Sequence, residues 1–220
     1  MTPEGILARL LYRDGLMLVI DKPAGVAVHR GPKGGSSLED DFDALRFGLP
    51  RAPALALLGK LFKQGKIAKT YWAVVEGAPA ADEGRIEIPL GKLDETRGWW
   101  MKPDPHGQPA VTTWKVMGRG PGHTWLALEP LTGRTHQLRV HCAEMGWPIV
   151  GDNIYGTQAS LRSLRKQEAS PRQGGPTLHL HARAIVVPIS KNKPPVTITA
   201  PVPAHMRELL AKCRWQTESK

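Results

Sequence analysis

The chain has 220 residues, 41% of them hydrophobic, which is enough to bury the core of one domain or of one domain with a small appendage. Its 30 lysines and arginines against 20 aspartates and glutamates give a formal charge of +10, which favours a polyanionic partner such as nucleic acid over an ordinary basic, solvated surface. A count of only two cysteines argues against a disulfide scaffold or a cysteine-based zinc site. The sequence has no signal-peptide pattern and no apolar run near the ~18 residues that span a bilayer. We therefore expect a reduced, cytoplasmic protein with no membrane segment.

The first half of the chain predicts one buried strand and two helices. The apolar run LMLVI at 16–20 has the length of a buried strand, and the turn sequence DKPAG closes it. Apolar residues at helical spacing predict a helix over 36–49, whose aspartates we interpret as a solvated helix N-terminus rather than as metal ligands. A second helix is predicted over 54–66, with Gly65 as its stop signal.

The second half of the chain is rich in strands. The segment AKTYWAVVEG at 68–77 combines aromatic and β-branched residues and predicts a strand. Further strands are predicted at 85–93, 109–120, 123–133, 178–189 and 196–203. An amphipathic helix is predicted to close the chain at 204–215, and the basic stretch 161–175 is either an exposed loop or an extra contact for RNA. The elements lack the regular alternation of a doubly wound fold.

A short polar motif, GRTHQLRVH at 133–141, carries the clearest chemical signal. It holds two arginines, two histidines, a glutamine and a threonine with only two aliphatic side chains. Interpreted as a strand, it turns Arg139 and His141 to one face and its aliphatic pair to the other, so that the pair anchors the arginine beside a cleft. Arg134 can reach a phosphate with its planar fork. The alternative is that Arg139 serves only in a buried ion pair, but the density of polar groups favours a site.

The polar motif is followed by GWPIVGDNIYG, and together they closely resemble a signature of the RluA-type pseudouridine synthases. The likeness extends over most of the chain, from about residue 16 to residue 203. Four further segments resemble family blocks in the family's order: LMLVIDKPAGVAVH, KTYWAVVEG, GQPAVTTWKV and LHLHARAIVV. Each segment alone is moderate evidence, whereas the ordered series is specific.

The resemblance implies an α+β fold with a mixed, largely antiparallel central sheet flanked by helices. It implies that residues 1–220 form a single catalytic domain without a separate N-terminal RNA-binding domain. The implied activity is the isomerisation of uridine to pseudouridine in structured ribosomal or transfer RNA, without a metal or redox cofactor. We expect RNA as the partner, and we expect the protein to be a monomer.

The family's reaction breaks the bond from N1 to C1′, rotates the uracil and joins C5 to C1′, after the base has been flipped from its stack. A carboxylate does the central work, as nucleophile at C1′ or as base at the 2′ carbon. The resemblance assigns Tyr71 to stacking on the uracil and removing the C5 proton, although a half-buried strand aromatic is the simpler interpretation of Tyr71. It assigns Arg139 to pairing with the catalytic carboxylate and holding the space left by the flipped nucleotide. The expected substrate- or RNA-binding residues are Lys22, Lys69, Arg134, His136 and Gln137.

The family's catalytic aspartate, in the sequence H-R-L-D, is absent from this chain. Its expected place is near residues 56–57, where a family member carries roughly twenty more residues for a loop, a strand and the start of a helix. The segment was either not recorded in this sequence, or removed from it, or lost naturally. A natural loss would leave Arg139 as an unpaired charge, which is costly, and we therefore favour an incomplete sequence.

Two rival functions remain. A catalytically inactive RNA-binding protein on the same scaffold would account directly for the absent aspartate. A basic enzyme acting on a phosphorylated small molecule would leave the ordered family segments unexplained, and the chain has no phosphate-binding P-loop.

Overall fold

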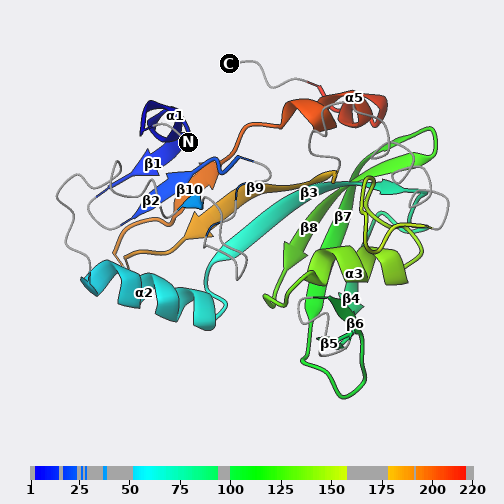
Figure 1. Cartoon of the computed structure of the whole chain (residues 1–220), viewed down its shortest axis with the longest axis horizontal. Helices are drawn as coiled ribbons and strands as arrows, with labels where there is room; N and C mark the ends of the chain where they lie inside the picture. The colour runs from blue at the N-terminus through cyan, green and yellow to red at the C-terminus, as the bar shows by residue number, and fades with distance from the viewer. Residues whose placement is uncertain are drawn as a thin grey trace. The chain divides into compact units, whose positions relative to one another are not determined.

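The computed structural model describes residues 3–14, 17–23, 26, 28, 37–38, 52–93, 100–157, 178–190 and 192–216. The helices are α1 Pro3–Leu7, α2 Ala52–Lys63, α3 Gln137–Glu144 and α5 Ala204–Lys212 (Figure 1). The strands are β1 Leu10–Arg13, β2 Leu18–Ile20, β3 Ala68–Glu76, β4 Glu83–Glu87, β5 Leu90–Lys92, β6 Met101–Pro103, β7 Val111–Gly120, β8 His123–Pro130, β9 Leu180–Val187 and β10 Val196–Thr199. None of the described helices is long and apolar enough to cross a membrane.

Two predicted segments lie outside the described residues. They are the helix over 36–49, apart from residues 37–38, and the basic stretch 161–175.

A six-stranded sheet forms the centre of the fold. Its strands are hydrogen-bonded in the order β10-β9-β3-β8-β7-β4, and the pairs β10–β9, β3–β8, β8–β7 and β7–β4 are antiparallel. Two small antiparallel hairpins, β1–β2 and β5–β6, accompany it. The predicted α+β class with a mixed, largely antiparallel sheet is confirmed.

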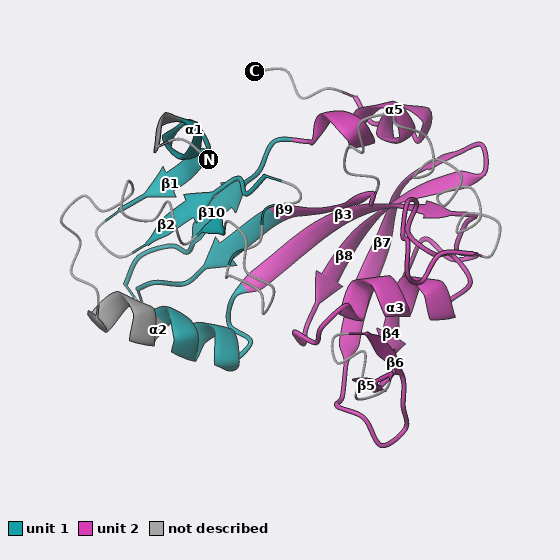
Figure 2. Ribbon diagram, viewed as in Figure 1, with its two compact units in different colours: residues 1–67, 184–201 teal, residues 68–183, 202–220 magenta. Residues whose placement is uncertain are grey.

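The chain divides into two compact units (Figure 2). One comprises residues 1–67 and 184–201, and the other comprises residues 68–183 and 202–220. In the first unit a core of Met17, Leu61, Ile67, Val187 and Ile198 holds α2 and the neighbouring strands.

Helix α2 ends as its sequence predicts. Gly65 has φ +65°, and the amide of Lys66 donates to the carbonyl of Leu61 while the amide of Gly65 donates to that of Phe62. This is the Schellman pattern, which glycine favours because it tolerates a left-handed backbone. The helix runs without interruption through Ala56 and Leu57, so this chain has neither a loop nor a strand at that position.

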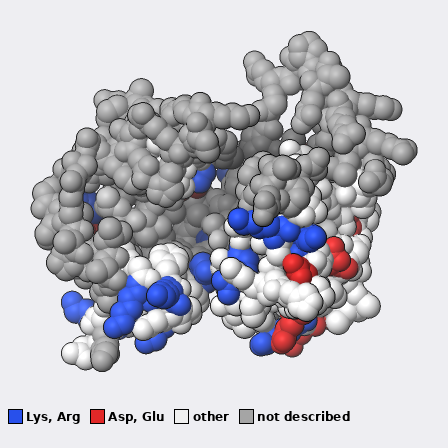
Figure 3. Space-filling view, turned by 60° about the horizontal axis from the view of Figure 1, so that its bottom comes forward, with Lys and Arg blue, Asp and Glu red and all other residues white. Residues whose placement is uncertain are grey.

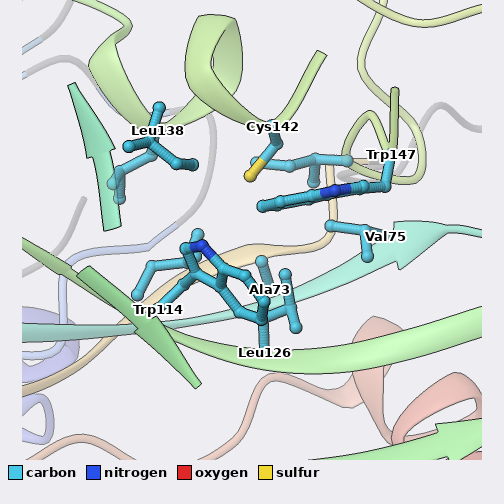
Figure 4. Packing of buried hydrophobic residues seen from close by; sticks show 10 residues of the cluster. Ala73, Val75, Trp114, Leu126, Leu138, Cys142 and Trp147 are labelled. Carbon is cyan, nitrogen blue, oxygen red and sulfur yellow. The ribbon is translucent and has the colours of Figure 1, made fainter. Parts of the chain in front are cut away.

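In the second unit the strand β3 sends alternate side chains to two cores, as its period-two pattern requires. Ala73 and Val75 pack with Leu126, Trp114 and the side chains of α3 on one face of the sheet (Figure 4). On the other face, Val74 and Trp125 pack with Met206 and Leu210 of α5 and with Val202 and Cys213, which flank that helix. Both faces of β3 are therefore covered at residues 73–75, directly after the stretch that carries Lys69 and Tyr71.

Candidate active site

A cavity of about 260 Å³ lies beside the N-terminus of α3, within the second unit. Its lining combines cationic, aromatic and amide side chains with a few apolar ones. The lining residues are Lys69, Tyr71, Pro130, Thr132, Gly133, Arg134, His136, Gln137, Leu138, Arg139 and Leu180. Six of the seven predicted site residues are therefore brought together, although they come from two segments more than 60 positions apart.

The polar motif is a turn followed by helix α3, which corrects the prediction of a strand. In a helix, Gln137 and His141 lie one turn apart on the same face, while Arg139 is directed elsewhere. Leu138 and Cys142 are also four positions apart, and both enter the core that contains Trp114 and Trp147. This spacing was the sequence signal for the helix, and the shorter alternation of aliphatic and polar residues concealed it.

Gln137 belongs to the interior of the protein, since only 3% of its surface is exposed. Its side-chain nitrogen donates to the carbonyl of Val111 (2.9 Å) and to Thr112 Oγ1 (3.0 Å). Its side-chain oxygen accepts from Thr132 Oγ1 (2.7 Å) and from the amide of Arg134 (3.1 Å). All four hydrogen bonds that a carboxamide can make are formed within the protein. The Gln137 amide thus fixes the turn before α3 to the start of β7, and its predicted role in binding RNA stays a prediction.

His141 extends the same network and is fully buried. Its Nε2 lies 3.1 Å from the carbonyl oxygen of Ile88, which can only accept, so Nε2 carries the proton. Its Nδ1 then accepts from Thr112 Oγ1 at 2.9 Å. Burial lowers the pKa of His141, partly offset by the bond to Ile88, and the ring stays neutral as part of the scaffold.

Arg139 forms a two-pronged ion pair with Asp152. Its Nε donates to Oδ2 at 2.7 Å and its Nη2 donates to Oδ1 at 2.6 Å. The two side chains are 12% and 0% exposed, so Asp152 cannot itself reach a ligand in the cavity. Burial raises the pKa of Asp152, but the bond from Arg139 and the amides of Tyr155 and Ile154 outweigh it and hold the pKa below its ordinary value.

This ion pair corrects our inference from the absent aspartate. Arg139 has a buried carboxylate partner in the chain as it stands, 13 positions further along, and its charge is not left unpaired. The cost of an unpaired charge therefore gives no reason to prefer an incomplete sequence over a natural loss. The sequence stretch that resembles the family signature included Asp152, but its acid had been given no role.

His136 completes the polar lining of the cavity, and Tyr155 contacts His136 without lining the cavity itself. His136 is the N-cap of α3 and has the left-handed angles φ 52° and ψ 16°. Its Nδ1 lies 2.9 Å from the hydroxyl of Tyr155, and its Nε2 lies 3.4 Å from Nη1 of Arg139. Burial and the charge of Arg139 lower the pKa of His136, partly offset by Asp152. Sequence reasoning had not singled out Tyr155.

Tyr71 and Lys69 project from the same face of β3, two positions apart. Tyr71 packs against the core and also lines the cavity. Burial raises its pKa, so the phenol remains protonated at neutral pH. The ammonium of Lys69 lies beside Gly133, 4.0 Å from the position that a Cβ atom would occupy there.

The remaining two predicted residues differ in their surroundings. The Nε of Arg134 donates to the carbonyl of Pro109 at 3.0 Å, which sets the arginine at the rim of the cavity. Lys22 belongs to the other unit, and its ammonium donates to the carbonyls of Pro23 and Val26 in its own turn. Lysines and arginines form patches on the face shown in Figure 3.

Comparisons with known proteins identify the family. Residues 51–144 match the family model for RNA pseudouridylate synthase. A protein named as an uncharacterized RNA pseudouridine synthase of Zymomonas mobilis is 36% identical over 224 residues, covering 91% of this chain and 96% of its own. Ribosomal large subunit pseudouridine synthase C of Haemophilus ducreyi is 33% identical, covering 93% of this chain and 69% of its own.

The fold agrees with that family. Human RNA Pseudouridylate Synthase Domain Containing 4 has a TM-score of 0.76 at 22% identity, covering 99% of this chain and 97% of its own. The family model and the curated relatives place this fold among RNA-modifying isomerases. The chain belongs to the RluA family of RNA pseudouridine synthases.

Proposed function

We propose that the protein isomerises specific uridines of ribosomal or transfer RNA to pseudouridine. The observation that carries the proposal is the convergence of Tyr71, Arg139, Lys69 and Arg134 on one cavity. The catalytic aspartate would be supplied by a segment that belongs near residues 56–57 and is absent from this sequence. We also propose that the protein acts as a monomer in the cytoplasm.

The lining residues suit a base that has been flipped out of RNA. The ring of Tyr71 offers a flat wall on which a uracil can stack, and its protonated phenol can form a hydrogen bond to the base. Lys69 and Arg134 are suited to the phosphates on either side, since such contacts position RNA without reading its sequence. Arg139 is held in place by Asp152 and keeps one edge of its guanidinium toward His136.

The lengths of the alignments support an absent segment. The match to the Zymomonas mobilis protein runs over 224 positions, which exceeds the 220 residues of this chain although it covers only 91% of them. That relative therefore has residues with no counterpart here.

A second candidate function is RNA binding without catalysis. It is favoured by the unbroken course of α2 through Ala56 and Leu57 and by the pairing of Arg139 with Asp152. The first observation is of a helix that forms without the family's aspartate segment, and the second is of an arginine that is paired without the family's aspartate.

One experiment separates the two functions. The 220-residue chain is compared with a version that carries the corresponding segment of the Zymomonas mobilis relative between Ala56 and Leu57, and with that version after its aspartate has been changed to asparagine. Each protein is incubated with ribosomal and transfer RNA, and both pseudouridine and RNA binding are measured.

We expect all three proteins to bind RNA and only the aspartate-containing version to form pseudouridine. Binding without product from that version would favour the second function. Product from the 220-residue chain itself would show that the aspartate segment is not required and would contradict our account of it.

A further inference from the structure

Tyr155 holds a central place beside the cavity without lining it. The backbone amide of Met101, on β6, donates to its hydroxyl oxygen at 2.9 Å. Nδ1 of His136 lies 2.9 Å from the same oxygen, and the two rings meet edge to face with centroids 5.6 Å apart. The guanidinium carbon of Arg139 lies 5.1 Å from the centre of the tyrosine ring, within cation–π range. One side chain therefore contacts the β5–β6 hairpin and two residues of the cavity wall.

The direction of these hydrogen bonds follows from which atoms can only donate. An arginine side chain has no acceptor, so Nε2 of His136 presents a lone pair to Nη1 of Arg139, even though the 3.4 Å contact is long. In a neutral imidazole the other nitrogen then carries the proton, and Nδ1 of His136 donates to Tyr155. The phenolic oxygen accepts two hydrogen bonds, from His136 and from Met101.

The opposite arrangement is electrostatically poor. A proton on Nε2 of His136 would point at the cationic guanidinium of Arg139. Among the residues that the structure describes, the other ionisable groups at this position do not reverse that preference. Asp152 is committed to Arg139 and to two backbone amides, while Lys69 and Arg134 on the cavity wall are cations.

The backbone conformation of His136 is also typical of a residue at a functional site. A left-handed conformation is uncommon for a residue other than glycine, and such strain gathers at functional sites. His136 occupies the N-cap position without forming a side-chain capping bond. Its ring is directed instead to Tyr155 and Arg139.

We propose that Tyr155 is a positioning residue, whose oxygen accepts a hydrogen bond from Nδ1–H of His136 and so keeps the Nε2 lone pair of that ring directed at Arg139, which Asp152 holds from its other side. Through the amide of Met101 the same oxygen ties the β5–β6 hairpin to the cavity wall. The proposal deepens the proposed function and rests on it only where turnover is concerned.

The first test is the protonation of the His136 ring, read at neutral pH from long-range proton–nitrogen NMR correlations of the side chain. The wild-type chain is expected to show a protonated Nδ1 and an unprotonated Nε2. Tyr155→Phe is expected to keep this tautomer, which Arg139 favours, but to leave the Nδ1–H proton without its acceptor, so that its exchange with water becomes faster. The matched variant Tyr12→Phe, which removes a hydroxyl bonded to Asp14 in the other unit, leaves the exchange unchanged. A protonated Nε2 in the wild type, or an unchanged exchange rate in Tyr155→Phe, would overturn the proposal.

The wild-type spectrum requires no variant, so it decides the tautomer even where Tyr155→Phe fails to fold. The second test is turnover by the version that carries the aspartate segment. Tyr155→Phe is expected to lower its kcat by about tenfold to a hundredfold, because a misplaced guanidinium loses alignment with the substrate, while KM for RNA changes little. An unchanged kcat, or an effect confined to KM, would contradict the positioning role.

Failure of the proposed function has a different signature. In that case the aspartate-containing parent forms no pseudouridine either, and the NMR result alone decides whether Tyr155 holds the His136 ring.

Discussion

Gln137 and His141 face the interior of the second unit, whereas His136 and Arg139, from the same nine-residue motif, contribute to the wall of the cavity. The inward pair is almost fully buried, and every hydrogen bond from the Gln137 amide ends on protein. The outward pair is only partly buried and is held by Asp152 and Tyr155. A concentration of polar side chains in the sequence can therefore belong to the scaffold as well as to the site. Which of the two roles a residue has depends on whether it faces the interior or the cavity.

This contrast between the inward-facing and the outward-facing residues predicts two kinds of mutational effect. Changes on the inward side should reduce the stability of the fold, because they leave buried polar groups unsatisfied. Changes at the rim should reduce RNA binding while the fold remains stable.

The largest expected effect comes from the support of the outward pair. Asp152→Ala leaves the charge of Arg139 buried without a partner, and we expect the free energy of unfolding to fall by about 3–5 kcal/mol. Urea unfolding measures this. Asp82→Ala is the matched control, since it removes an exposed ion pair with Arg119 that contributes ~0–1 kcal/mol. Equal losses from both variants would contradict the buried character of the Arg139 pair.

Gln137→Ala should reduce stability by about 2–3 kcal/mol, because it leaves buried donors and acceptors of Thr132, Val111 and Arg134 without partners. RNA affinity of the folded variant should stay unchanged. The exposed Gln108 gives a control, as Gln108→Ala should change stability by less than about 0.5 kcal/mol. A Gln137→Ala protein of normal stability that binds RNA poorly would instead support the predicted role of Gln137 in binding RNA.

Arg134→Ala should do the opposite. We expect a weaker affinity for all RNAs and a slope of log affinity against log salt that is shallower by about 0.7–0.9, the value for one lost phosphate contact. Binding is measured at several salt concentrations, with Arg85→Ala on β4 as a control that removes the same charge outside the cavity. Equal changes in slope from both variants would show that the cavity rim has no special part in RNA binding.

The smallest expected effect is the dependence of the free energy of unfolding on pH. Burial is the first cause that lowers the pKa of both His136 and His141, so below the ordinary histidine pKa the unfolded chain binds more protons than the folded one. Stability should therefore be fully present above pH ~6.5 and decline as the pH falls below it. Urea unfolding at pH 7 and pH 5 checks the sign. A stability that rises on acidification would contradict the conclusion that the rings of His136 and His141 are neutral in the folded protein.

Much of the fold could be predicted from local patterns. The strand predicted at 68–77 is β3, because aromatic and β-branched residues alternate between two cores. Gly65 ends α2, and the amphipathic pattern after Pro203 forms α5. These elements follow from short-range periodicity, which tertiary packing reinforced.

The candidate site was predictable only in part. Six of the residues predicted from the sequence line the cavity. The sequence could not show that the Gln137 amide makes all its hydrogen bonds within the protein, because its partners lie on β7 and in the turn before α3. Nor could the sequence pair Arg139 with Asp152, since the loop between them decides their distance. The helical course of the motif depended on Leu138 and Cys142 finding the tryptophan-lined core.

The central claim is that Tyr71 and Arg139 form part of a uridine-isomerising site. It is tested most directly by the release of tritium from RNA labelled at C5 of uridine, because joining C5 to C1′ removes the hydrogen at C5. The version of the chain that carries the aspartate segment should release tritium in step with pseudouridine formation, and its Tyr71→Phe variant should bind RNA but release almost none. No release from any ribosomal or transfer RNA, or full release by Tyr71→Phe, would contradict the account.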